Sequence, residues 1–362
     1  MVTVLTYFVS QSVSVIGSAD LMIFLKEYHS VIISIMIFVA TMYLGRKKTL
    51  ENVFLKFIAF TGAVCVFLDF SFFLFQQRFL NLIENLVQRE IFDPYVYNLD
   101  RERLNLYLHT ELFIPFFIYL AVQSWAKKKF GQAIFFSLLF LLTVFVSFQS
   151  NYRTRVVMMI FAVLLTVLIG LNSLVFKRSI MVVALFLSLF VLTTVSFSRS
   201  LRSFDVIDRF LLQDEAEDES TISYRFQSFD LAVEIFKSSP IVGVGLGNYQ
   251  LYVDTKRKFS LPTLSERKYF ETSVKDPHSI ISKLISETGL IGLLGFVFLI
   301  GFFFRQDYIY LKSRNVNYFS RGAYIIASWT IFIYGLFNPF NTIFINGWFW
   351  FLRGKLQADQ SL

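Results

Sequence analysis

Long apolar runs are the feature of this sequence that most constrains its fold. Runs of about 20 mainly apolar residues, enough to cross the hydrocarbon core of a bilayer as a helix, recur along the chain between short charged segments. Hydrophobic residues make up 55% of the 362 residues, and 46 residues are Phe, far more than one soluble core requires. The sequence therefore predicts an all-α polytopic membrane protein that forms a single integral membrane domain over residues 1–362.

The apolar runs predict about ten transmembrane helices. We place them near residues 3–24, 30–45, 53–75, 110–125, 131–149, 156–176, 180–197, 281–304, 322–338 and 341–352. The first run has no basic leader and no small-residue cleavage site, so we interpret it as a retained helix.

Basic clusters set the orientation of these spans. They lie at Arg46–Lys48, Lys127–Lys129, Lys177–Arg178, Arg305–Arg321 and Arg353–Lys355. By the positive-inside rule these clusters are cytoplasmic. Residues 76–109 then form a first outer loop, residues 150–155 a short outer hairpin, and residues 198–280 a large outer loop. The net charge of +8 follows from this topology and needs no nucleic-acid partner.

Residue usage limits the chemistry and directs attention to the outer loops. Cys65 is the only cysteine and there are three histidines, so an intrachain disulfide and a cysteine metal cluster are excluded. The large outer loop, of roughly 80 residues, is too long to be a mere connection. Its acidic run, Asp214–Glu219, is interpreted as a solvated tip.

Residues 220–236 of the large loop have the pattern of an amphipathic helix. Apolar side chains recur there at helical spacing: Phe226, Phe229, Val233 and Phe236. This aromatic side is expected to rest on the bilayer or on the spans, which would hold Arg225 at the depth of the lipid headgroups. Arg225 then either snorkels to lipid phosphate or binds a substrate.

A glycine-rich segment, Pro240–Asn248, follows this helix. Glycines have no Cβ, so the backbone amides of such a segment can approach a neighbour closely. A dinucleotide-binding turn is excluded because no βαβ unit surrounds the segment. We interpret it as a re-entrant turn that lines a polar cavity, with its backbone shielded from lipid.

The eighth predicted span begins with a polar segment that contains Asp276, Pro277 and His278. Asp276 is expected to cap the helix, with Pro277 at its first position and His278 in its first turn. The positive end of the helix dipole favours a neutral imidazole, which could accept a proton as a general base. The alternative is an ordinary interfacial histidine, which is also our interpretation of His29 and His109.

The outer hairpin at residues 150–155 carries Arg153 and Arg155, close to the membrane because the hairpin is short. A guanidinium binds phosphate bidentately, so an arginine here, beside Arg225, would suit a phosphorylated lipid headgroup, although chance placement is the alternative. Three acidic residues fall toward the outer ends of predicted spans: Asp20, Asp69 and Glu111. They could hold sugar hydroxyls or pair with these arginines.

Together these segments resemble the family of O-antigen ligases and O-antigen polymerases, bacterial membrane glycosyltransferases that use polyprenyl-diphosphate glycans. Tyr152–Arg155 resembles the family's serine–arginine turn, with Tyr or Thr before each arginine instead. Residues 225–248 resemble its arginine, amphipathic helix and glycine-rich turn. Residues 278–292 resemble its histidine-led start of a span marked by Glu-Thr-Gly, with Ser279 where asparagine is frequent.

The resemblance covers roughly residues 150–300 and implies a GT-C-like fold and a set of site residues. Arg225 and His278 would be catalytic, and the diphosphate and glycan would contact Arg225, Gly245, Asn248 and either Arg153 or Arg155. The resemblance implies neither a metal nor an organic cofactor. Membrane lipids and a chain-length regulator protein are further expected partners, and nucleic acid is not one.

The activity that the resemblance implies is that of an O-antigen polymerase in the bacterial inner membrane, with its active site facing the periplasm. It would transfer a growing glycan from undecaprenyl diphosphate to the non-reducing-end sugar of another lipid-linked repeat unit, with inversion. A ligase that transfers the glycan to lipid A core is the alternative. A flippase or transporter is the competing class, but such proteins usually carry ionisable groups near the midplane, whereas the candidate charges here gather at one face.

Overall fold

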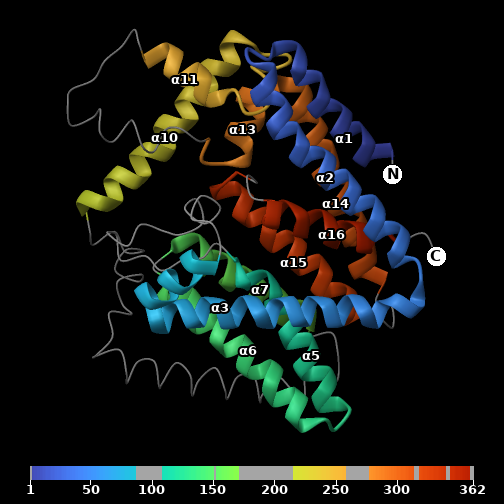
Figure 1. The fold of residues 1–362 in the computed structure, drawn as a ribbon. Coiled ribbons are helices and arrows are strands. Elements are labelled where there is room, and N and C mark those ends of the chain that lie inside the picture. The colour runs from blue at the N-terminus through green and yellow to red at the C-terminus, as the bar shows by residue number, and fades with distance from the viewer. Residues whose placement is uncertain are drawn as a thin grey trace. The chain divides into compact units, whose positions relative to one another are not determined.

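The computed structural model describes residues 2–86, 108–150, 152–170, 215–257, 277–313, 318–339 and 343–358 (Figure 1). Every regular element in these ranges is a helix, which confirms the all-α class. The predicted span at 180–197, most of the first outer loop and the predicted cap at Asp276 lie outside the described residues.

Contacts divide the chain into two compact units, and each is described by itself. The first unit comprises Met1–Ala40, Asp214–Asn315 and Ile333–Phe351. The second unit comprises Thr41–Gln213, Val316–Phe332 and Leu352–Leu362.

Five helices of the described ranges are long and apolar enough to cross a membrane. They are α2 (Leu21–Gly45), α3 (Glu51–Leu86), α6 (Phe130–Gln149), α7 (Arg153–Gly170) and α14 (Gly289–Ser313). Two apolar helical segments are shorter, Val2–Gly17 and Thr110–Ala126. The polytopic class is thereby confirmed, while the total of ten helices stays a prediction.

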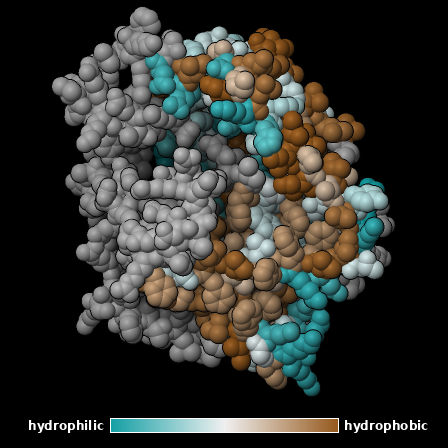
Figure 2. All heavy atoms as spheres, in the orientation of Figure 1, coloured by the Kyte–Doolittle hydropathy of each residue, from teal (hydrophilic) through white to brown (hydrophobic). Residues whose placement is uncertain are grey.

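The spanning helices expose large apolar side chains along much of their length. Phe60 of α3 is 70% exposed and Phe298 of α14 is 64% exposed. Brown apolar surface covers much of the coloured part of the face drawn in Figure 2. Soluble monomers rarely expose contiguous apolar surface on this scale, so these helices are suited to contact with lipid.

The first predicted span is wrong in its bounds. α1 (Val2–Val13) and the 3-10 turn η1 (Ser14–Gly17) are followed by a turn at which Asp20 begins α2. The Asp20 carboxylate accepts the backbone N–H groups of Met22 and Ile23, at 2.8 and 3.1 Å. Because this side chain satisfies two otherwise orphan donors, a new helix starts here and the residues after Asp20 belong to α2.

Small residues hold α1 against α14 in the first unit. A Cβ added at Gly295 of α14 would lie 2.3 Å from the hydroxyl of Ser10, so glycine permits this close approach, as is common between membrane helices. Phe8 of α1 is buried and its ring centroid lies 4.7 Å from that of Trp350, which belongs to α16 (Ile343–Ala358).

In the second unit, α3 packs against a short 3-10 helix and the helix that follows it. These are η4 (Thr110–Phe113) and α5 (Ile114–Ala126). A Cβ at Gly62 of α3 would lie 2.9 Å from the rings of Phe113 and Phe117. Phe116 of α5 meets Tyr324 edge to face at 4.9 Å; Tyr324 belongs to α15 (Tyr318–Phe337).

Candidate functional site

The arginine-bearing helix of the large predicted loop is α10 (Glu215–Ser238). Its buried face is Ser228, Ala232 and Ile235, which packs against α11 (Tyr249–Arg257) and α13 (Ile280–Glu287). Two members of the predicted aromatic stripe, Phe226 and Phe229, are 66% and 45% exposed. The helix therefore packs through this face, and these two aromatic rings lie on another side of it.

His278 lies immediately before α13. The Ser279 hydroxyl accepts the backbone N–H of Ser282 at 3.0 Å, so Ser279 is the N-cap and the helix begins at Ile280. The predicted place of His278 in the first helical turn is therefore wrong, because the cap falls one residue after it. The His278 backbone N–H donates instead to the hydroxyl of Ser228, at 3.3 Å.

This hydrogen bond brings two predicted catalytic residues to the same part of the first unit. Arg225 precedes Ser228 by three residues, and residues at that spacing are neighbours on one side of a helix. The guanidinium carbon of exposed Arg225 lies 5.9 Å from the centroid of the Phe337 ring, within range of a cation–π contact. The backbone of His278 therefore contacts the turn of α10 that carries Arg225.

The glycine-rich segment pairs with the junction between α13 and α14. The N–H groups of Val244 and Gly245 donate to the carbonyls of Ser286 and Glu287, at 3.0 and 2.9 Å. Two further hydrogen bonds have their donors in α14 and their acceptors in the glycine-rich segment. The N–H groups of Leu290 and Ile291 donate to the carbonyls of Pro240 and Ile241, at 2.8 and 3.2 Å. The close neighbour of these amides is therefore the protein's own backbone.

An interruption between two helices makes this pairing possible. α13 ends at Glu287 and α14 begins at Gly289, which has φ +60°, so the predicted continuous span at 281–304 is wrong. A Cβ at Gly289 would lie 2.7 Å from the carbonyl oxygen of Ile241. At Gly243, with φ +71°, a Cβ would lie 2.3 Å from the carbonyl carbon of Glu287. Only glycine combines positive φ with this proximity.

Gly245 and Asn248 both have structural contacts in the first unit. A Cβ at Gly245 would lie 2.7 Å from the Cα of Ser18. Asn248 is 1% exposed; its Oδ1 accepts the N–H of Asp20 and its Nδ2 donates to the Ser18 hydroxyl, each at 3.0 Å. These contacts explain both residues without a substrate, and the substrate-binding role inferred for them stays a prediction.

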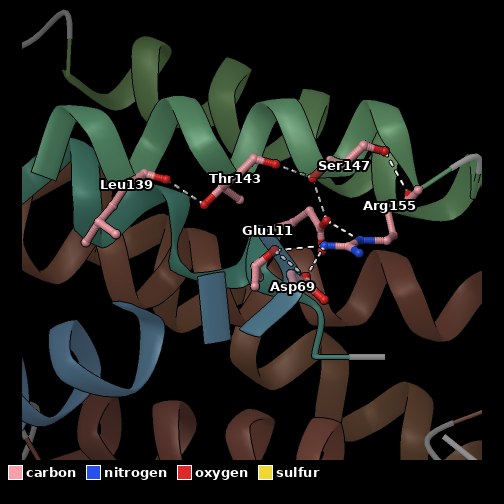
Figure 3. A network of polar contacts seen from close by, with 8 residues as sticks. Asp69, Glu111, Leu139, Thr143, Ser147 and Arg155 are labelled. Carbon is pink, nitrogen blue, oxygen red and sulfur yellow. Dashed lines mark hydrogen bonds and ion pairs between the residues drawn. The ribbon is translucent and has the colours of Figure 1, made fainter. Parts of the chain in front are cut away.

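Arg155 of α7 lies in a buried ionic cluster of the second unit (Figure 3). Its Nε donates to Glu111 Oε1 at 2.5 Å, and its Nη2 donates to Asp69 Oδ2 at 2.7 Å and to Thr110 Oγ1 at 2.8 Å. The Ser147 hydroxyl donates to the same Glu111 oxygen at 2.6 Å. Arg155 and Glu111 are 0% exposed and Asp69 is 3% exposed.

The cluster changes the interpretation of the acidic residues. Pairing with a hairpin arginine, one of the two predicted roles for Asp69 and Glu111, is confirmed, whereas Asp20 caps α2. Two carboxylates face the guanidinium of Arg155, so the fork that would hold a diphosphate is already bound by carboxylate oxygens. Arg153, two residues earlier, is partly exposed.

His109 is a residue whose surroundings the sequence did not indicate. It was interpreted as interfacial, which is wrong: it is fully buried and precedes η4 with φ 45°. Burial, with a smaller contribution from the positive charge of Arg155, lowers the pKa of His109 to about 3. His109 is therefore neutral at neutral pH.

The six predicted site residues divide between the units. The first unit contains Arg225, Gly245, Asn248 and His278, and the second contains Arg153 and Arg155. Within the first unit the predicted residues share one backbone framework, built by the glycine-rich segment and the start of α14.

The fold and these residues define a helical membrane protein with three features: an arginine-bearing helix, a glycine-rich segment paired with the start of a spanning helix, and a histidine that precedes that start. A family model described as O-antigen ligase matches residues 135–297, a little under half of the chain. The resemblance of this segment to the O-antigen ligase family is thereby confirmed. No curated protein matches the sequence.

The matched segment contains both arginines of the hairpin, Arg225, the glycine-rich segment and His278. The family supports a glycosyltransferase-like activity of the O-antigen ligase or polymerase type, acting on lipid-linked glycans in a membrane. It does not separate polymerase from ligase.

Proposed function

We propose that this protein is an O-antigen polymerase, an inverting glycosyltransferase of the bacterial inner membrane whose active site faces the periplasm. It would move a growing glycan from undecaprenyl diphosphate onto the non-reducing-end sugar of another lipid-linked repeat unit. The observation that carries the proposal is the contact of His278 with Ser228, one helical turn from exposed Arg225, inside the segment that matches the family.

The reaction needs a group that stabilises the departing diphosphate. A diphosphate is already a good leaving group, so the protein has chiefly to bind it and offset the negative charge that grows as the glycosidic bond breaks. The guanidinium of Arg225 offers a planar set of donors for two phosphate oxygens. In a partly dry site one well-placed donor contributes about 3 kcal/mol to the transition state.

The reaction also needs a group that takes the proton of the acceptor hydroxyl. His278 is half-buried and lies outside the helix that follows it, in the segment that contacts α10 through Ser228. We assign it the role of general base: it would remove the proton as the hydroxyl oxygen attacks the anomeric carbon from the face opposite the diphosphate. A single displacement of this kind inverts the configuration.

Of the two hairpin arginines, we assign diphosphate binding to Arg153. The guanidinium of Arg155 already meets Asp69 and Glu111, and two carboxylates around one cation leave no positive charge to attract a phosphate. The role of Arg153 rests on the resemblance of the hairpin, and its partly exposed side chain is compatible with it.

A ligase is the second candidate, because the matching family is described as O-antigen ligase. A ligase would use the same donor and the same two residues but would transfer the glycan once, to lipid A core. The acceptor therefore distinguishes the two activities. A flippase would move labelled glycolipid between leaflets without any growth of the glycan.

The test is incubation of the purified protein with synthetic undecaprenyl-diphosphate repeat units, followed by separation of the products on a gel. A ladder of glycans supports the polymerase. Transfer that appears only when lipid A core is added would reassign the protein as a ligase, and transport in vesicles without a new glycosidic bond would refute the enzyme. A chain-length regulator protein, the further expected partner, would narrow the ladder when added.

Variants of Arg225 and His278 test the assigned roles in the same assay. Arg225→Ala is expected to abolish product, whereas Arg225→Lys, which keeps the charge without the planar fork, should retain a small fraction. Lys237→Ala is the matched control, because Lys237 is an exposed cation at the end of the same helix. His278→Ala should also abolish product, with His29→Ala as its control. Normal product from Arg225→Ala, at a normal protein level, contradicts the proposal.

A further inference from the structure

Three segments of the first unit meet at the side chain of Ser228. Ser228 of α10 is 0% exposed, and Tyr249, the first residue of α11, is 1% exposed. The Tyr249 hydroxyl donates to the Ser228 carbonyl at 3.1 Å and lies 3.3 Å from the Ser228 hydroxyl. The Ser228 hydroxyl also accepts the backbone N–H of His278 at 3.3 Å. α10, α11 and the segment before α13 are thus joined through two buried hydroxyls.

His278 makes this contact from a position outside the helices. His278 precedes the N-cap Ser279, so its N–H has no partner within α13 and needs one elsewhere. Ser228 supplies that partner. Since Ser228 is one turn from Arg225 on α10, the same contact sets the distance between the backbone of His278 and the helix that carries Arg225.

Tyr249 holds Ser228 in turn. Its ring is part of a buried cluster with Ala232 and Ile235 of α10, together with Val244 and Val253. The phenol oxygen emerges from this cluster beside Ser228. Because the ring is fixed by packing, the hydroxyl is fixed too, and a buried hydroxyl of this kind requires a hydrogen-bond partner.

We propose that Ser228 and Tyr249 are positioning residues. They hold His278 at the position relative to Arg225 that proton removal from the acceptor hydroxyl requires. The inference rests on the proposed function of His278. Neither hydroxyl touches the substrate in this scheme. Ser228 acts through the backbone of His278, and Tyr249 acts through Ser228. A displacement of a reacting group by about 1 Å can lower a rate about 100-fold, so loss of these contacts should appear in kcat.

The test compares variants that remove one oxygen atom each. Ser228→Ala and Tyr249→Phe are each expected to lower kcat at least about tenfold while KM for the lipid-linked donor stays within about twofold, because Arg225 is unchanged. Ser228→Thr, which keeps the hydroxyl, should recover most of kcat. Ser238→Ala on α10 and Tyr252→Phe on α11 are matched controls, and both should leave kcat unchanged.

A second measurement is independent of turnover. The chain has three histidines, so the imidazole signals of ¹⁵N-histidine-labelled protein are few, and His278→Ala identifies which belong to His278. Ser228→Ala and Tyr249→Phe are expected to shift the His278 signals and leave those of His29 and His109 in place. A general loss of packing would move the His109 signals as well, because His109 is fully buried.

The outcomes separate this inference from the proposed function. If His278→Ala retains full activity, the proposed role of His278 fails and the inference fails with it. If His278→Ala is inactive but Ser228→Ala and Tyr249→Phe keep normal kcat and normal His278 signals, only the positioning role is refuted. If KM rises as much as kcat falls, the two residues act on donor binding, which also overturns the inference.

Discussion

Removing the guanidinium of Arg155 is expected to destabilise the protein more than removing either of its carboxylate partners. The cluster contains one cation and two anions, all nearly inaccessible to solvent. Arg155→Met leaves Asp69 and Glu111 buried together without a counter-ion. Asp69→Asn leaves Arg155 and Glu111 as a balanced pair, and the new amide oxygen can still accept from the guanidinium.

The magnitudes follow from this difference in charge. Breaking a buried ion pair by removing one partner costs about 3 to 5 kcal/mol of unfolding free energy, because a charge remains buried without compensation. Arg155→Met should lie at the upper end of that range. Asp69→Asn exchanges a charge-assisted hydrogen bond for a neutral one, and should cost about 1 kcal/mol. Thr110, which bonds both Arg155 and Asp69, can satisfy part of what is lost.

Equilibrium unfolding of the purified variants in mixed micelles, followed by circular dichroism, measures these differences. Arg46→Met is the control, since Arg46 is an exposed cation in the same unit and should change stability by less than about 0.5 kcal/mol. Equal losses for Arg155→Met and Asp69→Asn would show that the charge balance does not govern the cluster, and the reasoning would be wrong.

Three further predictions concern acidity, backbone conformation and the hairpin. The pKa of His109 is lowered to about 3 in the folded protein and is about 6.5 in an unfolded chain, so the unfolded state binds more protons between these values and stability is lost as pH falls. At pH 5 this amounts to about 2 kcal/mol, and His109→Gln should remove that part of the pH dependence measured by unfolding. Gly243→Ala should lower the unfolding temperature, because Gly243 has φ +71° and a Cβ there would lie 2.3 Å from a backbone carbon. The control is Gly131→Ala, in open space within a helix, which should raise the unfolding temperature slightly. An unchanged unfolding temperature for Gly243→Ala would contradict the packing argument. Arg153→Ala should abolish glycan transfer with normal stability, whereas Arg155→Ala should lower both; loss of stability in Arg153→Ala would mean that its activity loss says nothing of diphosphate binding.

Apolar runs predicted helices well where charged segments bounded them. The predicted span at 131–149 corresponds to α6 at Phe130–Gln149, because the preceding basic cluster ends one helix and permits the next. The predictions failed at Asp20 and Gly289, where apolar sequence continues across a break. A carboxylate that caps the start of one helix, or a glycine in the left-handed region just after the end of another, sets a helix boundary at a single residue. Average hydropathy over about 20 residues does not register such a signal.

The site was predictable only in part for a different reason. A charged residue near a predicted span is expected to find a partner, so an ion pair of Arg155 was foreseeable. Its actual partners, Asp69 and Glu111, are 86 and 44 residues away in sequence, and one sequence does not say which of several acidic residues will be chosen. The contact between Ser228 and His278 has no sequence signal at all, because serine is common on helices and accepts from many donors.

The paired backbone segments explain why a glycine-rich turn and a Glu-Thr-Gly sequence occur together in this chain. The first N–H groups of α14 have no partner within their own helix, and in an apolar environment each unsatisfied donor is costly. Pro240 and Ile241 accept two of them, while Ser286 and Glu287 accept donors from the glycine-rich segment. Each segment therefore satisfies the backbone of the other, and glycine is needed where they approach most closely. The resemblance in these two segments therefore reflects a structural joint that fixes the end of α10 beside the junction of α13 and α14. It follows that substrate contacts should be sought at Arg225 and His278, which the joint positions, and not at the glycines that form it.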